Sequence, residues 1–255
     1  MIDNMSEETT TSIKHWDEFK NTITGYINLP GKRRDQLIFR GQSNSSWGLL
    51  SSLDRQLQNN ITLKGRNREE VRISLLDAFK REILGLNVSA DITEPIEWEC
   101  YARHHGLPTR ILDWTSSPYI AAFFALTGDL KLMGDSVAIW ILDRAAFEES
   151  HVPVNTTDSR STLLSEYIEI YDDLDLLRIN PRAIEQKALF MVVKDAKIAI
   201  ERRLFKYLSR ILISAEDREL ALADLYEMNI SARNLYRDPE SATTTAVWRV
   251  MKDSI

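Results

Sequence analysis

An arginine at the end of a short apolar run is the first feature of this sequence that indicates chemistry. The run Gln36–Arg40 (QLIFR) predicts a strand, and Gly41 and Gln42 follow it. A guanidinium at the end of a strand lies at an edge or cleft, where it can make a bidentate contact to a phosphate or carboxylate. The glycine allows a ligand to approach the backbone closely. Arg40 is therefore a candidate catalytic and anion-binding residue, and Gly41 and Gln42 are candidate ligand-binding residues beside it. The alternative for Arg40 is a structural ion pair with a carboxylate.

A second candidate segment, residues 103–116 (RHHGLPTRILDWTS), joins a predicted helix to an almost wholly apolar one. Its candidate ligand-binding and catalytic residues are His104, His105, Arg110, Asp113, Thr115 and Ser116. Asp, Thr and Ser before a helix act as N-terminal caps, and a helix N-terminus also attracts anions, so these residues fit either role. Adjacent histidines point about 100° apart on a helix and do not form a metal-binding pair. We expect no metal site.

A third candidate is the pair Glu185 and Gln186, which stands just before the apolar run 188–193 (ALFMVV). A carboxylate or amide at this place is suited to catalysis or to a ribose contact, and the alternative is an exposed approach to the strand. On a strand the two side chains would point to opposite faces, so only one would enter a cleft. We predict that Arg40, Arg110, Asp113 and Gln186 converge in one cleft.

The elements that must position these residues follow from hydrophobic periodicity. The sequence predicts helices at 12–28, 68–86, 94–105, 116–126, 163–177, 215–228 and 241–252, and strands mainly at 36–40, 137–142, 188–193 and 210–213. Residues 109–114 are expected to be short and extended. Uninterrupted apolar runs are typical of buried elements. The residues expected in the core on this ground are Phe123, Phe124, Val137, Ile139, Ile141 and Leu189.

The composition limits the class of protein. With 255 residues, 44% hydrophobic and 27% charged, the chain is typical of a globular protein. The net charge of −6 argues against a nucleic-acid coat, and Cys100, the only cysteine, excludes an internal disulfide. No apolar run is long enough to span a membrane, and Met1–Thr11 lacks the apolar core of a secretory signal. We expect a cytoplasmic enzyme or interaction domain with no membrane partner.

Four segments together resemble the FRG domain family: FRGQSNSSWGLLSSLDR, ECYARHHGLPTRILDWTSSPYIAAFFAL, NPRAIEQKALFMV and ISAEDRELALADLYEMNI. Two places depart from the family pattern: Ser51 stands where a proline is usual, and Lys187 to Leu189 lack the usual glycine. The resemblance implies an N-terminal helix and approach segment at 1–34, an FRG domain at 35–236 and a tail helix at 237–255. It implies one compact α+β domain with a small mixed or split β-sheet flanked by helices.

The order of the three candidate segments also resembles, more weakly, that of ADP-ribosyltransferases. That resemblance implies that Arg40 grips a phosphate or ribose of NAD, that Thr115 and Ser116 line the nicotinamide pocket, and that Glu185 or Gln186 contacts the ribose. NAD would be a substrate, and ADP-ribose would pass to a macromolecule, either protein or nucleic acid, or to water. The implied setting is bacterial conflict, as a toxin or an antiphage effector.

Two other functions are consistent with the residues. In a ligand-sensing or partner-binding module, Arg40 and Arg110 would hold an anion without chemistry. In a metal-assisted nuclease, His104, Asp113 and Glu185 would act together, although no ligand cluster with metal spacing is present in the sequence.

Overall fold

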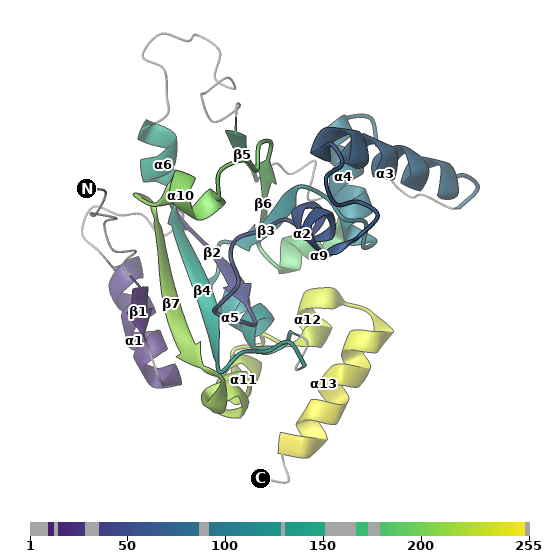
Figure 1. Cartoon of the computed structure of the whole chain (residues 1–255). Coiled ribbons are helices and arrows are strands. Elements are labelled where there is room, and N and C mark those ends of the chain that lie inside the picture. Colours follow the sequence, from purple (N-terminus) through teal and green to yellow (C-terminus); the bar gives the residue numbers. More distant parts are fainter. Residues whose placement is uncertain are drawn as a thin grey trace, which may run out of the picture.

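A β-sheet forms the centre of the molecule. The computed structural model describes residues 10–12, 15–28, 36–86, 92–128, 131–150, 167–172 and 179–252. The strands in these ranges are β1 (Thr10–Ser12), β2 (Leu37–Gln42), β3 (Ile111–Thr115), β4 (Ser136–Asp143), β5 (Ile168–Tyr171), β6 (Ala188–Val193) and β7 (Leu208–Ser214). They form one sheet in the order β1-β7-β4-β2-β3-β6-β5 (Figure 1). Only β1 and β7 run parallel, so the sheet is mixed and the predicted α+β class is confirmed.

The inner strands form where the sequence is apolar without interruption. In β4, all six residues from Val137 to Leu142 are buried, and in β6 all six residues are buried. A strand covered on both faces needs apolar side chains on both, which is why neither segment alternates with polar residues. The strands predicted at 137–142 and 188–193 are confirmed.

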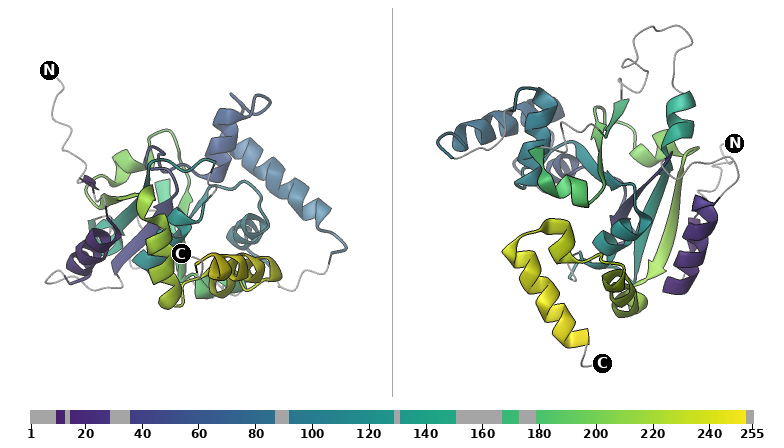
Figure 2. Two further views of the ribbon diagram at one scale, coloured as in Figure 1. Left: turned by 90° about the horizontal axis from the view of Figure 1, so that it is seen from below. Right: turned by 180° about the vertical axis from the view of Figure 1, so that it is seen from behind.

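Helices cover the sheet on both faces. Those in the first half of the chain are α1 (Trp16–Ile27), α2 (Ser52–Asn59), α3 (Arg68–Glu82), α4 (Pro95–His104), α5 (Pro118–Leu126) and α6 (Arg144–Ser150). Those in the second half are α9 (Pro181–Glu185), α10 (Ile200–Leu204), α11 (Arg218–Glu227), α12 (Ala232–Tyr236) and α13 (Pro239–Lys252). In Figures 1 and 2, α3 projects from the body, and α13 runs along its outside. None of the described helices is long and apolar enough to cross a membrane.

The two faces of β2 belong to different cores. Phe39 packs with Trp16 and Phe19 of α1 and with α5 and α11 on one face, whereas Ile38 packs with Trp140 on the other. The alternation follows from the two-residue period of a strand. It assigns Arg40 and Gln42 to the face of Ile38, and Gly41 to the face that α5 covers.

The sheet opens between β2 and β3. The ladder between these strands has the one register pair Phe39↔Thr115, whereas β2 pairs with β4 over six residues and β3 pairs with β6 over five. Past that pair, the backbones of Arg40 and Gly41 on β2 have no register partner on β3. We call this opening, bounded by Arg40, Gly41, Asp113 and Trp114, the strand fork.

One predicted helix is wrong. Of the range 163–177, residues 168–171 form strand β5, which pairs with β6, and residues 163–166 and 173–177 lie outside the described residues. The acidic residues suggested a solvent-facing helix. In β5, however, isoleucine and charged or aromatic residues alternate, and that two-residue period fits an edge strand with one buried side.

A second correction concerns the approach to β6. Asn180 caps a short helix whose first residue is Pro181, so Glu185 ends α9 and Gln186 is its C-terminal cap. Lys187, with φ of 47°, is left-handed and ends the helix before the strand begins. The two side chains therefore do not alternate across a strand as predicted. Phe124 is also only partly buried, whereas the other five predicted core residues are buried.

Candidate functional site

Arg40 bridges the strand fork. Its Nη1 donates a hydrogen bond of 2.6 Å to the backbone carbonyl of Asp113 on β3. Its Nε is buried and has no hydrogen-bond partner among the described residues. Buried donors are nearly always paired, so this atom and Trp114 Nε1 at the same fork both lack the partner that a buried donor normally has.

Asp113 lies next to this contact, and Arg103 of α4 holds its carboxylate. Arg103 Nε lies 2.9 and 3.0 Å from the two carboxylate oxygens, and Nη2 also donates to one of them. Arg103 Nη1 reaches Ser52 Oγ at the start of α2, at 3.3 Å. The side chain of Asp113 is 44% exposed although it stands on an inner strand, so the fork is open to solvent.

A third arginine, Arg55 of α2, completes a group that we call the arginine cluster: Arg40, Arg55 and Arg103. Arg55 is exposed, and its Nη1 donates to the carbonyl of Leu50 at 2.8 Å. Arg103 pairs with the carboxylate of Asp113, and Arg40 and Arg55 lie near enough to interact with its charge. The neighbouring carboxylate of Asp54 is already paired with Arg68 at 2.6 Å. The cluster therefore carries excess positive charge.

The pKa shifts at the fork follow from this crowding. Burial lowers the pKa of Arg40 to about 10; the charge of Asp113 opposes this, and repulsion from Arg103 and Arg55 adds to it. Arg40 stays charged at pH 7, but the single negative charge of Asp113 does not balance the positive charges of Arg40, Arg55 and Arg103. Burial alone would raise the pKa of Asp113, yet the charge and hydrogen bonds of Arg103, together with the charge of Arg40, hold that pKa below its usual value.

Thr115, at the end of β3, ties the fork to α9. Its Oγ1 donates to the carbonyl of Gln186 at 2.7 Å and accepts the backbone N–H of Ser117 at 3.1 Å. Ser116 is exposed, and its N–H donates to the carbonyl of Lys187 at 3.0 Å. The step before α5 therefore lies directly beside the end of α9.

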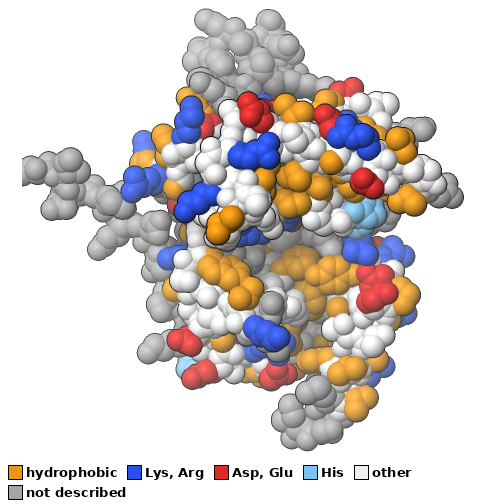
Figure 3. Space-filling model, turned by 45° about the vertical axis from the view of Figure 1, so that its right-hand side comes forward, with side chains coloured by type: hydrophobic (Ala, Val, Ile, Leu, Met, Phe, Trp, Pro, Cys, Tyr) orange, Lys and Arg blue, Asp and Glu red, His pale blue; other side chains and the backbone are white. Residues whose placement is uncertain are grey.

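Three contacts, which we call the α9 latch, join α9 to the C-terminal helices. Gln186 Nε2 donates to the carbonyl of Leu235 at 3.2 Å, Arg237 pairs with Glu185 at 2.8 Å, and Arg182 pairs with Asp238 at 2.7 Å. Figure 3 shows the molecule hollowed across its middle, between the part that holds α2, α4 and α9 and the part that holds α12 and α13. The latch thus joins the two parts, and the candidate residues Glu185 and Gln186 belong to it.

Gly41 and Gln42, which follow Arg40, make their contacts with other parts of the protein. A Cβ built on Gly41 would lie 1.9 Å from the carbonyl oxygen of Ala121, so α5 fills the space where a ligand was expected to approach. Gln42 is buried; it accepts from Trp140 Nε1 at 2.5 Å and donates to the carbonyl of Gly48 at 3.0 Å. The structure gives both residues packing partners within the protein.

Arg110 does not join the cluster. It pairs at 2.9 Å with Glu99, which is 1% exposed and also pairs with Arg72 at 2.7 Å. Arg110 precedes β3, whereas Asp113 and Thr115 stand further along it. Of the four residues predicted to converge, Arg40 and Asp113 meet at the fork, Gln186 lies beside Thr115, and Arg110 belongs to a separate buried ion group.

The two histidines stand at the end of α4. His104 is partly buried, and burial lowers its pKa, with added repulsion from Arg182 and His105. His105 is exposed and its ring lies 4.6 Å from that of Tyr101. Among the described residues, no group of three His, Cys, Asp or Glu side chains is close enough to hold a metal ion.

Part of the chain matches a known family: residues 35–132 fit the family model of the FRG domain. The chain contains an FRG domain. The comparisons with curated proteins and with solved structures found no match.

The matched residues contain the whole arginine cluster, Asp113 and Thr115, and they end before α9. Sequence reasoning missed Arg55 and Arg103 as site residues. Both lie within the strings that resemble the FRG family, SSLDR and YARHHGLPTR, and that is the signal that could have found them. Their convergence depends on the placement of α2 and α4 over the fork, which local sequence patterns do not specify.

Proposed function

We propose that the FRG domain binds the phosphates of NAD or a related nucleotide at the strand fork. The observation that carries this proposal is the arginine cluster, in which three guanidinium groups interact with the charge of one carboxylate and only that of Arg103 pairs with it. Planar guanidinium groups match phosphate oxygens with paired hydrogen bonds, and the unpaired Nε of Arg40 would gain an acceptor. The opening of the sheet at the fork leaves a way in from solvent.

We further propose an ADP-ribosyltransferase-like fold and reaction. In that reaction the bond between the ribose C1′ and the nicotinamide nitrogen breaks, and the bonding electrons leave with nicotinamide. Water or a nucleophile of a macromolecule then bonds to the cationic C1′ and loses its proton. The amide oxygen of Gln186 or the carboxylate of Glu185 would stabilise the positive carbon, as in other glycosidic cleavages. The proposed setting is the bacterial cytoplasm, where the protein would act as a toxin or antiphage effector.

Calorimetric titration with NAD, run beside an assay for nicotinamide release, tests both steps. Arg55→Ala should weaken NAD binding about tenfold or more, the effect of losing a charged hydrogen bond. Arg40→Lys should keep only part of the affinity, because an ammonium lacks the planar fork. Arg66→Ala is the matched control, because Arg66 is an exposed arginine outside the cluster. Gln186→Ala and Glu185→Gln should spare binding, and the variant that lowers release identifies the group beside C1′.

A binding module without turnover is the second candidate, and one observation favours it. The carboxylates of Asp113 and Glu185 are both paired with arginines, so neither is free to face a reacting carbon. NAD binding without nicotinamide release would support this module and overturn the enzyme. Absence of both binding and release would overturn the two proposals together. The nuclease alternative gains no support, since its residues Asp113 and Glu185 are held in separate ion pairs.

A further inference from the structure

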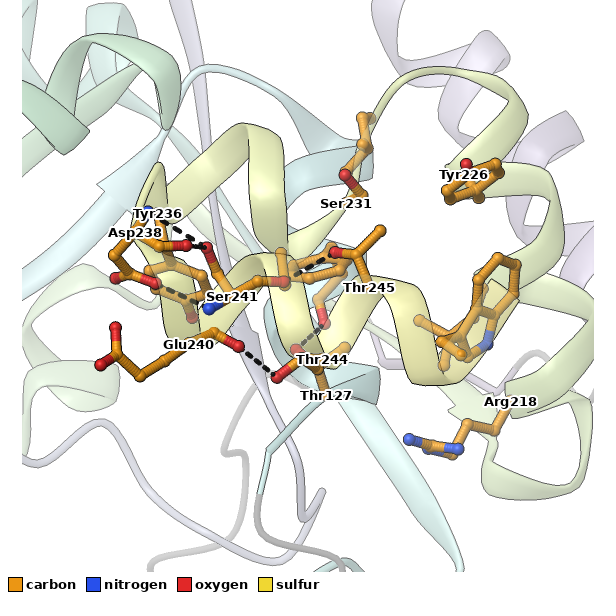
Figure 4. A pocket seen from close by; sticks show the side chains of 15 residues that line it. Thr127, Arg218, Tyr226, Ser231, Tyr236, Asp238, Glu240, Ser241, Thr244 and Thr245 are labelled. Atoms are coloured by element: carbon orange, nitrogen blue, oxygen red, sulfur yellow. Dashed lines mark hydrogen bonds between the residues drawn. The ribbon is translucent and has the colours of Figure 1, made fainter. Parts of the chain in front are cut away.

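A second cavity lies away from the arginine cluster, beneath the last helix. It has a volume of about 430 Å³, is partly open to solvent and is lined by residues of α5, α11, α12 and α13 (Figure 4). None of the arginine cluster, Asp113, Glu185 or Gln186 lines it. Its volume is that of a site for a small organic molecule. Neither the match to the FRG domain nor the proposed nucleotide site accounts for it.

Aromatic side chains line the cavity at both ends. Tyr226 and Trp248 lie at one end, with ring centroids 5.0 Å apart. Tyr236 lies at the other end, where the guanidinium of Arg182 stands 5.8 Å from its ring centroid. Phe123 and Leu222 complete the apolar lining and are buried. Flat aromatic walls favour a ring that can stack against them or meet them edge-on.

The threonine hydroxyls of the cavity can only accept hydrogen bonds from an occupant. The hydroxyls of Thr127, Thr244 and Thr245 donate their protons to backbone carbonyls, at 2.7, 3.1 and 2.9 Å respectively. Their oxygens therefore offer only lone pairs to an occupant, and that of Thr245 already accepts the backbone N–H of Arg233 at 3.0 Å. An occupant would thus meet acceptors along the threonine edge.

The charges are arranged along the cavity. Figure 4 shows Asp238 and Glu240 together at one end and Arg218 at the opposite end. Two of the three guanidinium nitrogens of Arg218 are paired within the protein: Nε donates to the carbonyl of Leu126 at 2.8 Å, and Nη1 pairs with Glu219. Asp238 pairs with Arg182. Glu240 is exposed at the acidic end and makes that end attractive to a cation.

We propose that this cavity binds a small aromatic amine. The ring would occupy the space between Tyr226, Trp248 and Tyr236. The amino group would donate to the threonine edge and lie near Glu240. The same walls would hold an aromatic carboxylate poorly, because its charge would meet Glu240 and its oxygens would find no donor on the threonine edge. Apolar burial would supply affinity, and the acceptors would supply selectivity.

Three probes of similar shape test the chemical class: 2-phenylethylamine, propylbenzene and 3-phenylpropionate. Binding is measured by titration calorimetry and by saturation-transfer NMR on the wild-type protein. We expect the amine to bind severalfold more tightly than the hydrocarbon and at least tenfold more tightly than the carboxylate. No binding of the amine would overturn the site. Equal binding of all three probes, or tightest binding of the carboxylate, would overturn the proposed class.

Two threonines on α13 provide the matched variants. Thr244→Val removes the hydroxyl that lines the cavity at nearly constant shape. Thr243→Val removes the hydroxyl of the preceding residue, which donates to the carbonyl of Pro239 at 3.1 Å and does not line the cavity. Both residues are exposed, so both variants should fold, and near-ultraviolet circular dichroism checks that the Tyr226–Trp248 pair is intact. Thr244→Val should weaken amine binding about threefold to tenfold and leave hydrocarbon binding unchanged. An equal effect of the two variants on amine binding, or no effect of either, would overturn the proposal.

Discussion

Replacing Gly41 by alanine tests whether the glycine of the FRG motif serves the fold or a ligand. The added Cβ would lie 1.9 Å from the carbonyl oxygen of Ala121 and 2.8 Å from the backbone nitrogen of Ala125. Carbon and oxygen atoms that are not bonded normally stay more than about 3 Å apart, so α5 would have to retreat by about 1 Å or more. The atoms in the way are helix backbone, which cannot rotate aside as a side chain can.

The size of the loss follows from what α5 buries. Seven of its nine residues are buried, and they pack on the core that contains Phe39 and Ile139. Forcing extra volume into a packed core costs about 1–3 kcal/mol, and more where backbone must move. Because a shift of α5 disturbs most of its buried contacts at once, we expect Gly41→Ala to lower the free energy of unfolding by about 3 kcal/mol or more.

Urea denaturation followed by far-ultraviolet circular dichroism measures this change. Gly25→Ala is the matched control: Gly25 lies on the exposed side of α1 with nothing within 4 Å of its added Cβ. That variant should gain about 0.5–1 kcal/mol from the higher helix propensity of alanine. If Gly41→Ala unfolds at the same urea concentration as the wild type, the packing argument is refuted. A stable Gly41→Ala protein that no longer binds NAD would return the glycine to a ligand-binding role.

Three further predictions concern stability. Glu99→Gln should lower the free energy of unfolding by about 3–5 kcal/mol, because it leaves two arginines without their buried carboxylate, and it should leave NAD affinity unchanged in a calorimetric titration. Phe123→Ala should cost about 3–4 kcal/mol in urea denaturation and Phe124→Ala clearly less, because only the first side chain is buried; equal losses would contradict this. The lowered pKa of Asp113 stabilises the fold above its unfolded pKa of about 3.9, and this contribution is lost as the pH falls through the folded pKa. The stability gap between wild type and Asp113→Asn, measured in urea at pH 6 and pH 3, should therefore shrink at the lower pH, and a constant gap would show that Arg103 does not hold the carboxylate charged.

The central strand β4 and the buried helix α5 could be predicted because their sequences are apolar throughout and are therefore compatible only with the protein interior. The run 137–142 has no polar residue, and 118–126 is apolar on all sides, so each had to be covered by neighbours. The edge strand β5 could not be separated from a helix by composition. Its four residues gain their conformation from pairing with β6, a partner that is distant in sequence.

The candidate site was predictable only in part, because it too depends on contacts between residues that are distant in sequence. Arg40 and Asp113 stand at the ends of apolar runs, and that local pattern identified them as candidates. Arg55 and Arg103 are ordinary helix residues by pattern, and they become part of a cluster only through the packing of α2 and α4. The capping sequence of Asn180 and Pro181 is a local helix signal before Glu185 that our interpretation of a strand approach overlooked.

The α9 latch has a consequence for the order in which the protein is made. Synthesis proceeds from the N-terminus, so a growing chain contains the residues of the arginine cluster long before Leu235, Arg237 and Asp238 exist to hold α9. Strand β1 also cannot pair until late in synthesis, because its partner β7 lies about 200 residues later in the sequence. A nascent chain on the ribosome can therefore present its cationic residues before Gln186 is fixed beside Thr115. The complete site, with Gln186 held beside Thr115 by the α9 latch, can form only after the chain has been synthesised beyond Asp238.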